Sequence, residues 1–250
     1  MMRRQRELRE WLDLRRQLTE ARLTRREVRK LGLLLGGGGL LGGGLRIPRV
    51  AAQSSSGDGP VSPPTTPWLE RLPIPPVASP VAPFATSAAH QFFARFPPQR
   101  YYRLTLQERQ HSFHPELPTS PIFGYNGIFP GPTVDARYGR PILVRFVNEL
   151  PPLASARGFG VPQDITHLHN FHSASESDGG PWDWIDPGQS RDHHYTLARA
   201  GFTVPDTIPA EFRGSDGGDV RESLTTLFFH DHRPEFTAAN VYKGLAAFCR

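Results

Sequence analysis

Residues 141–147 read Pro-Ile-Leu-Val-Arg-Phe-Val, a short run of β-branched and aromatic residues that begins at a proline. Runs of this composition, bounded by turn-forming residues, are typical of β-strands. Similar runs occur at residues 101–106, 193–197, 224–230 and 245–248. Glycine and proline separate these runs, and none has helical periodicity. Together they predict an all-β domain, either a sandwich or a barrel.

Two histidine pairs with the same spacing lie in this strand-rich region, His167-Leu168-His169 and His230-Asp231-His232. In a strand, residues i and i+2 face the same side about 6.6 Å apart, so each pair can present two imidazoles to neighbouring metal ions. Four imidazoles without a cysteine suit copper, nickel, iron or zinc. The alternative is a structural sandwich whose histidines bind nothing. Asp231, between two candidate ligands, is expected to face the other way and to have a structural role.

The net charge of +5 comes from the N-terminus. Residues 1–30 hold eleven Lys and Arg against five Asp and Glu, so the rest of the chain is close to neutral. This balance does not predict a nucleic-acid partner. The single cysteine, Cys249, excludes an intrachain disulfide and a thiolate zinc cluster. The other six histidines are interpreted as ordinary surface or loop residues: His90, His111, His114, His172, His193 and His194.

The N-terminal segment predicts export. Arg25 and Arg26 precede the uncharged, Leu- and Gly-rich residues 31–45, and Val50-Ala51-Ala52 then offers a small-residue cleavage site. The paired arginines indicate a twin-arginine signal peptide over residues 1–52. A membrane anchor is the alternative, but the uncharged run is shorter than the roughly 20 residues needed to span a bilayer. We therefore expect a periplasmic or extracellular protein that is not held in a membrane after cleavage.

Residues 53–83 are dominated by Ser, Pro and Gly, which predicts a linker that becomes an extended, docked arm. Its few apolar residues, Trp68-Leu69 and Leu72-Pro73-Ile74-Pro75, are its expected anchors. The globular domain is then expected over residues 84–250.

An ordered set of motifs around the histidine pairs closely resembles the multicopper oxidases. Residues 124–133, followed by 141–151, resemble the opening motif of that family and stand at the expected distance before the first pair. His167-Leu168-His169 with Ser177-Asp178-Gly179-Gly180 is similar to the family's first copper motif. Phe228-Phe229-His230-Asp231-His232 is similar to its second.

The resemblance covers about residues 68–250 and is nearest to the spore-coat laccase and bilirubin oxidase branch. Three further segments carry it toward that branch: residues 72–75, 101–114 and 240–245. It implies a cupredoxin domain, an eight-stranded Greek-key β-sandwich, as the first of three such domains. The expected order along this chain is therefore signal peptide, Pro/Ser-rich linker and N-terminal cupredoxin domain.

The resemblance also implies the role of each candidate site residue. His167 resembles a ligand of the type 2 copper, and His169, His230 and His232 resemble ligands of the type 3 copper pair, where dioxygen is reduced to water. Asp178 resembles the carboxylate that orients water and relays protons to that cluster, a role that proton-consuming chemistry requires. The alternative for Asp178 is a turn residue of an Asp-Gly-Gly sequence.

The sequence departs from the family pattern in two respects. Asn170 stands where the family commonly has glycine, a tolerable change because asparagine accepts a left-handed backbone. The family's later ligands, a His-x-x-His-x-His motif and a His-Cys-His segment for the type 1 copper, do not occur, and Cys249 has Phe248 and Arg250 as neighbours instead of histidines. Half of the ligands of the trinuclear cluster are therefore present, which predicts a truncated gene product, a fragment, or a subunit completed by a C-terminal cupredoxin domain in cis or in trans.

Two functions compete at this point. The first is the N-terminal part of a copper-dependent, laccase-like oxidase that couples one-electron oxidation of a small-molecule substrate to the reduction of dioxygen. The second is a stand-alone exported copper-binding module without turnover. In the truncated chain the histidine pairs are expected to line an open surface, beside Phe228 or Leu168 if either turns toward it. The last strand is expected to leave an unpaired edge, so that the isolated chain associates or is poorly soluble.

Overall fold

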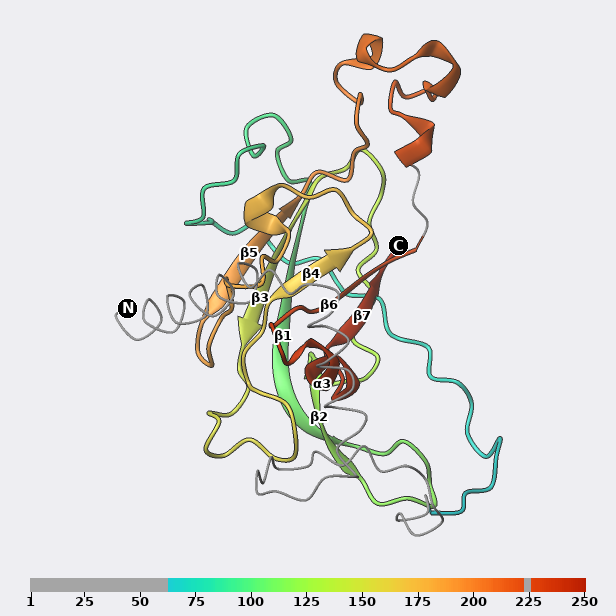
Figure 1. The fold of residues 1–250 in the computed structure, drawn as a ribbon, viewed down its shortest axis with the longest axis vertical. Helices are drawn as coiled ribbons and strands as arrows, with labels where there is room; N and C mark the ends of the chain where they lie inside the picture. Colours follow the sequence, from blue (N-terminus) through green and yellow to red (C-terminus); the bar gives the residue numbers. More distant parts are fainter. Residues whose placement is uncertain (1–62, 223–225) are drawn as a thin grey trace, which may run out of the picture. The chain divides into compact units, whose positions relative to one another are not determined.

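The computed structural model describes residues 63–222 and 226–250 (Figure 1). The predicted signal peptide and the first part of the linker lie outside the described residues. The described part is one compact unit that starts at Pro64. Its elements are β1 (Arg100–His111), β2 (Ser120–Tyr125), β3 (Ile142–Asn148), β4 (Thr166–His169), β5 (Ser190–Tyr195), β6 (Leu227–Asp231), α3 (Thr237–Tyr242), β7 (Ala246–Cys249) and four single 3-10 turns at Ser175–Ser177, Pro205–Thr207, Ala210–Phe212 and Val220–Glu222.

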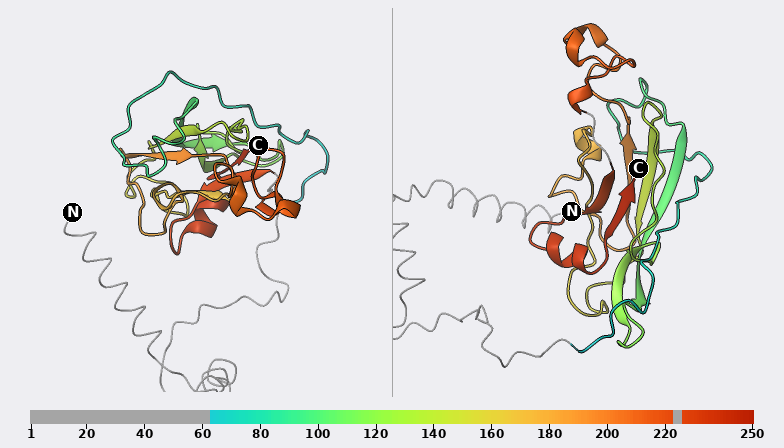
Figure 2. Two further views of the ribbon diagram at one scale, coloured as in Figure 1. Left: turned by 90° about the horizontal axis from the view of Figure 1, so that it is seen from above. Right: turned by 90° about the vertical axis from the view of Figure 1, so that its right-hand side faces the viewer.

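The strands form two sheets that pack face to face (Figure 2). The larger sheet has the order β2-β1-β3-β5, in which β1 and β3 run parallel and the other neighbours are antiparallel. The smaller sheet has the order β4-β6-β7 and is antiparallel throughout. The all-β, cupredoxin-like sandwich predicted from the sequence is therefore confirmed, with seven strands in the described residues where the resemblance implied eight.

Three aromatic rings join the two sheets at the centre of the core. Tyr125 on β2 and Phe146 on β3 come from the larger sheet, and Phe229 on β6 comes from the smaller one. Their ring centroids lie 4.9 to 5.8 Å apart in edge-on or tilted arrangements. Each side chain is almost fully buried, and burial of one large apolar side chain contributes about 1.5–3 kcal/mol. This cluster fixes β6, and therefore the second histidine pair, against the larger sheet.

Most predicted strands are present, and β2 is the one that the sequence did not indicate. Its sequence, Ser-Pro-Ile-Phe-Gly-Tyr, contains a proline and a glycine, which are depleted in strands. It forms because residues 106–111 extend β1 and pair with it along its whole length. The strand predicted at residues 224–230 begins at Leu227, next to residues 223–225, which are not described.

The predicted free edge of the last strand is wrong. Residues 131–136 run beside β7: the Gly131 N–H donates to Ala246 O, the Val134 N–H to Phe248 O, and the Arg250 N–H to Val134 O. The backbone groups on that side of β7 are thus paired, which removes the template for further strand addition.

The arm before β1 docks through residues other than those expected. Ala78 donates its N–H to Thr133 O and is buried, and the Val81 N–H donates to Tyr101 O. Trp68 and Leu72, by contrast, are almost fully exposed. Backbone pairing at residues 77–81 therefore attaches the arm, and the apolar residues before it do not anchor it to the sandwich.

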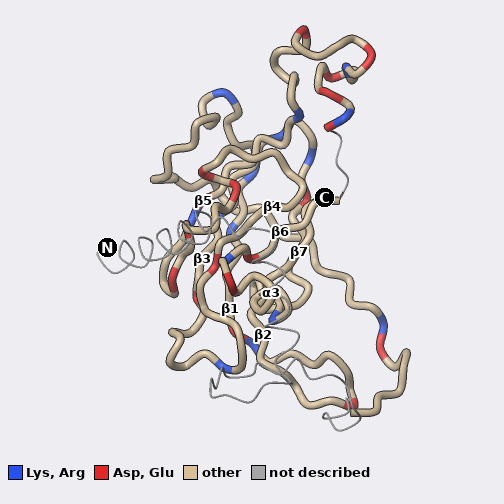
Figure 3. Tube along the Cα trace, viewed as in Figure 1, with Lys and Arg blue, Asp and Glu red and all other residues tan. Residues whose placement is uncertain are grey.

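Basic and acidic side chains are interspersed over the described residues (Figure 3), which agrees with a nearly neutral domain. None of the helices in residues 63–222 and 226–250 has the length and apolar character that crossing a membrane requires.

Candidate metal centre

The pairing of β4 with β6 brings the two histidine pairs onto one face of the smaller sheet. In the antiparallel register His167 lies opposite His230, and His169 lies opposite Phe228. Because side chains alternate along a strand, His232 follows His230 on the same face. Leu168 and Phe229 point the other way and are buried in the core.

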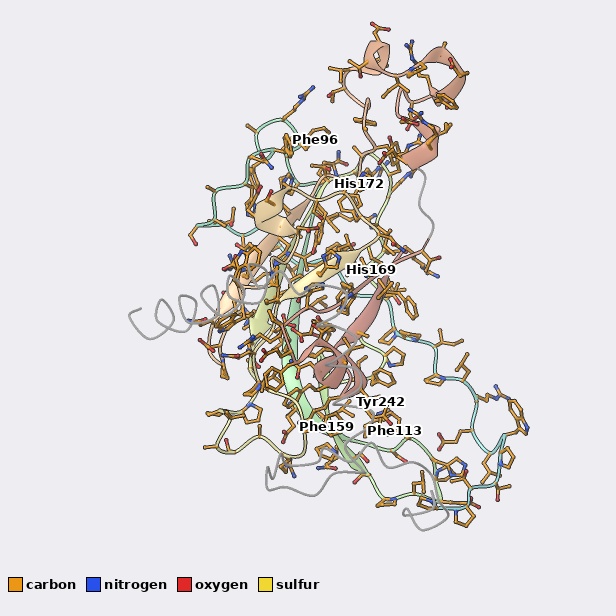
Figure 4. The ribbon with its side chains drawn as sticks, in the orientation of Figure 1. Phe96, Phe113, Phe159, His169, His172 and Tyr242 are labelled. Carbon is orange, nitrogen blue, oxygen red and sulfur yellow. The ribbon has the colours of Figure 1, made fainter. Side chains whose placement is uncertain are left out.

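The four imidazoles are close neighbours. The His167 ring centroid lies 5.7 Å from that of His169, 5.6 Å from that of His230 and 5.2 Å from that of His232. The His230 ring lies 5.4 Å from His169 and 5.9 Å from His232. The structure thus brings all four predicted ligands together, with His169 at the end of β4 (Figure 4).

Of the two apolar residues considered beside this face, only Phe228 contributes to it. Its ring stacks on His169 at 4.5 Å with an interplanar angle of 20°. Leu168 is 1% exposed and belongs to the core. The histidine face is therefore bordered by an aromatic ring that limits the rotation of His169.

Backbone carbonyls determine which nitrogen is free on two of the rings. His167 Nδ1 lies 2.5 Å from Asp178 O, and His230 Nδ1 lies 2.7 Å from Asp231 O. A carbonyl oxygen only accepts, so each Nδ1 carries a proton and donates it, and the lone pair is left on Nε2. This is the second hydrogen bond that metal-bound histidines typically make.

The remaining nitrogens fit a metal. His230 Nε2 faces His169 Nδ1 at 3.2 Å, close to the separation of two nitrogens that each lie about 2 Å from one ion in a tetrahedral arrangement. Nδ1 of His232 is buried without a hydrogen-bond partner, a costly arrangement unless a ligand completes it. Four imidazoles without a thiolate are a donor set that suits copper.

The face is not a closed site by itself. Within residues 63–222 and 226–250, no three His, Cys, Asp or Glu side chains form a group that could hold one metal ion. Closed metal sites need about four protein ligands arranged around each ion. The chain therefore presents an open, partial ligand set.

Burial keeps the buried imidazoles in the form that binds metals. It lowers the pKa of His230, and the nearby His167 and His169 lower it further. Burial and the neighbouring His167 likewise lower the pKa of His232. At neutral pH both rings are uncharged, as a histidine ligand must be.

Asp178 lies beside the histidine face, at the end of the 3-10 turn Ser175–Ser177. Its Oδ1 is 3.7 Å from His167 Nδ1, while its carbonyl accepts the bond from that ring. Gly179 follows with φ +80°, and a Cβ there would lie 2.4 Å from Thr166 O. Only glycine permits the turn to approach β4 this closely, so the Asp-Gly-Gly sequence positions Asp178 as well as forming a turn.

Asp231 faces away from the histidines, as the strand period requires. Its carboxylate accepts bonds from the Ile165 N–H, the Arg233 N–H and Asn240 Nδ2. Burial raises the pKa of Asp231 to about 6, against these bonds, which favour the charged form. It connects β6 to the segment before β4 and to α3, which is the expected structural role.

The expected left-handed backbone of Asn170 is also present, with φ 65°. This conformation turns the chain away at the end of β4, immediately after His169. Asparagine is among the few residues other than glycine that adopt it at low cost.

The interpretation of the other histidines as surface or loop residues is wrong for two of them, His193 and His194, whereas His90 lies in a loop although it is buried. His193 and His194 are buried and lie on β5 within the larger sheet. Burial lowers the pKa of His193 to about 3, so this ring is neutral. The sequence does indicate that these two residues belong to a strand, because His193-His194 opens a strand-like run. They lack the i, i+2 spacing that indicates metal ligands, so the sequence did not single them out. His172 is exposed in the loop after β4, as expected (Figure 4).

Cys249 is buried on β7. Burial, and to a smaller degree Asp135, raises the pKa of its thiol to about 12. The group is therefore a neutral thiol at physiological pH, which does not act as a metal ligand or nucleophile.

Fold and site together define a cupredoxin-like β-sandwich domain with an open, four-histidine face. Residues 105–204 match the family model described as multicopper oxidase. Over these residues the chain is therefore similar to the multicopper oxidases.

Named relatives show the same similarity. The chain is 29% identical over 194 residues to a laccase of Bacillus stratosphericus, covering 72% of this chain and 32% of the laccase. It is 29% identical over 175 residues to the bilirubin oxidase of Albifimbria verrucaria, covering 70% of this chain and 24% of that enzyme. The chain thus spans a third or less of the length of these relatives.

Among solved structures, a multi-copper oxidase from Pediococcus acidilactici matches with a TM-score of 0.50 at 20% identity. The match covers 72% of this chain and 29% of that one. At this identity the likeness supports the fold alone.

Proposed function

We propose that this chain is the N-terminal part of a laccase- or bilirubin-oxidase-like multicopper oxidase and supplies half of the histidines of its trinuclear copper cluster. In this proposal His167 is a ligand of the type 2 copper, and His169, His230 and His232 are ligands of the type 3 pair. Bound copper would supply the electron-transfer chemistry that reduces dioxygen to water with electrons from a small-molecule substrate.

One observation carries the proposal: four imidazoles from β4 and β6 share one face, and hydrogen bonds leave ring nitrogens free toward it. The His169 Nδ1 and His230 Nε2 pair at 3.2 Å supports one shared ion. The absence of a three-residue group among the described residues supports ligands distributed over several ions, each completed from elsewhere.

The chain's own residues would then act in three ways. Asp178 O holds the proton of His167 Nδ1 and so keeps Nε2 deprotonated for binding. The Asp178 carboxyl, 45% exposed and next to that ring, can take a proton from solvent and hold it at the edge of the cluster. Phe228 covers one side of His169 and excludes water from it.

The remaining ligands must come from another segment, and we propose a C-terminal cupredoxin domain, in cis or in trans. The substrate pocket would lie outside the described residues, so we propose no identity for the reducing substrate. We further propose export by the twin-arginine route, on the basis of Arg25, Arg26 and the apolar run after them.

The experiment is a copper titration of the full chain against a competing chelator. We expect Cu(II) binding that weakens at least about tenfold in the double variant His169→Ala, His230→Ala. The matched control is His172→Ala, because His172 is an exposed loop histidine close to the same strand end. Equal affinities of the wild-type chain and the double variant would contradict the proposal.

A second measurement tests the need for another segment. The copper-loaded chain should show neither intense blue absorption nor oxygen consumption with a phenolic substrate. Sustained oxygen consumption by the homogeneous chain would show that it is complete without a further domain.

A further inference from the structure

The turn that carries Asp178 is held by two buried histidines on the opposite sheet. His193 Nδ1 lies 2.9 Å from Ser177 O, and the His194 N–H donates to Ser177 Oγ at 2.9 Å. Ser177, the residue before Asp178, is completely buried. The carbonyl and the hydroxyl of Ser177 therefore each have a hydrogen-bond partner on β5.

His193 makes this contact in one defined state. Ser177 O can only accept, so His193 Nδ1 carries the proton and donates it. The ring is 1% exposed and meets the Phe146 ring edge-on at 5.3 Å, and burial keeps it uncharged. A neutral, packed ring with one directed donor is a rigid support for the carbonyl it binds.

The next two residues, Asp178 and Gly179, connect this turn directly to the histidine face. Asp178 O accepts the Nδ1 proton of His167, and Gly179 approaches the backbone of Thr166 more closely than any other residue type could. A displacement of Ser177 is thus transmitted directly to the acceptor of His167, because the two carbonyls belong to consecutive residues. The path runs from β5 through the 3-10 turn to β4.

We propose that His193 and Ser177 are positioning residues that fix the tautomer of His167, holding its proton on Nδ1 and its lone pair on Nε2. A neutral imidazole in water favours the opposite tautomer, with the proton on Nε2, so the carbonyl has to be held in place to reverse this preference. For copper binding, the inference rests on the proposed role of His167 as a ligand. For the tautomer itself, it stands on the metal-free chain.

The test uses the full chain with 15N-labelled histidine, free of metal, and records the ring nitrogens by NMR. A His167→Gln spectrum identifies the His167 signals. We expect Nδ1–H in the wild-type chain and a shift toward Nε2–H in His193→Phe, which removes the donor and keeps a ring of similar size. His193→Asn, whose amide can donate from the Nδ1 position, should restore the wild-type signal.

Two more variants are needed: Ser177→Ala as a second test of the contact, and a core variant as a control for the loss of stability. Ser177→Ala removes the bond from the His194 N–H and should give a smaller shift in the same direction; it decides the matter if His193→Phe does not fold. Leu104→Ala, in the core strand β1, destabilises the fold without touching this path and should leave the His167 tautomer unchanged.

The outcomes separate this inference from the proposed function. A His167 tautomer that is unchanged in the foldable variants, or that changes equally in Leu104→Ala, overturns the positioning role. If the wild-type tautomer is Nδ1–H and the variants shift it, the positioning role holds, even if the chain binds no copper and the proposed function fails. Where copper binds, the tautomer shift should accompany a loss of affinity of about tenfold or more.

Discussion

Acidification should destabilise this domain through His193, because that residue is buried as a neutral ring. Burial lowers its pKa in the folded chain to about 3, whereas the ordinary value is 6.5. Between these two values the unfolded chain binds a proton that the folded chain does not. Stability attributable to His193 is therefore intact above about pH 6.5 and is lost progressively as the pH falls toward 3.

The magnitude follows from the two pKa values. From pH 7 to pH 4, proton uptake by the unfolded chain lowers the free energy of unfolding by about 3 kcal/mol. That is a large part of the 5–15 kcal/mol typical of a domain. His193→Phe removes the titrating group, so its loss of stability over the same interval should be smaller by about 3 kcal/mol.

The assay is urea denaturation at pH 7, 5.5 and 4, followed by tryptophan fluorescence. His193→Phe also loses the bond to Ser177 O, but that loss is the same at every pH and does not affect the slope. His111→Phe makes the same chemical change at a partly exposed histidine and controls for the loss of an imidazole as such. Parallel pH dependences in the wild-type chain and His193→Phe would refute the reasoning.

Three further predictions concern the fold and the predicted signal peptide. Gly179→Ala places a Cβ 2.4 Å from Thr166 O at a positive φ, so we expect a loss of at least about 2 kcal/mol in urea denaturation and weaker copper binding; wild-type values in both would contradict the close approach. Phe229→Ala removes one ring of the cluster between the sheets and should cost about 3–5 kcal/mol of unfolding free energy, and a cost below about 1 kcal/mol would mean that the core does not depend on it. Replacing Arg25 and Arg26 by Lys should leave uncleaved precursor inside the cell in a fractionation experiment; normal export would count against a twin-arginine signal.

The candidate site was predictable because its pattern is local. His167 and His169 share a face whatever surrounds them, and the same period assigned Asp231 to the other side. The same period also places Phe228 on the histidine face and Leu168 on the other, and the β4–β6 register was needed only to show that Phe228 lies opposite His169. The sequence predicted the candidate ligands, and the structure added how their rings are oriented.

The parts that were missed depend on contacts between distant residues. β2 contains a proline and a glycine and forms only because β1 continues beside it. The edge of β7 is covered by residues 131–136, more than a hundred positions earlier in the chain. His193 is buried because its ring packs against Phe146 in the core, and no spacing rule indicates which carbonyl it meets.

The opposition of His167 and His230 across β4 and β6 determines where the chain tolerates changes in length. A slip of one residue between these strands would turn His167 and His169 into the core and bring Leu168 to the surface. A single inserted or deleted residue within either strand would therefore abolish both the ligand face and part of the core at once. Residues 196–222, between β5 and β6, belong to no strand of either sheet and are under no such constraint, so lineages of this domain should vary in length there and not in the strands.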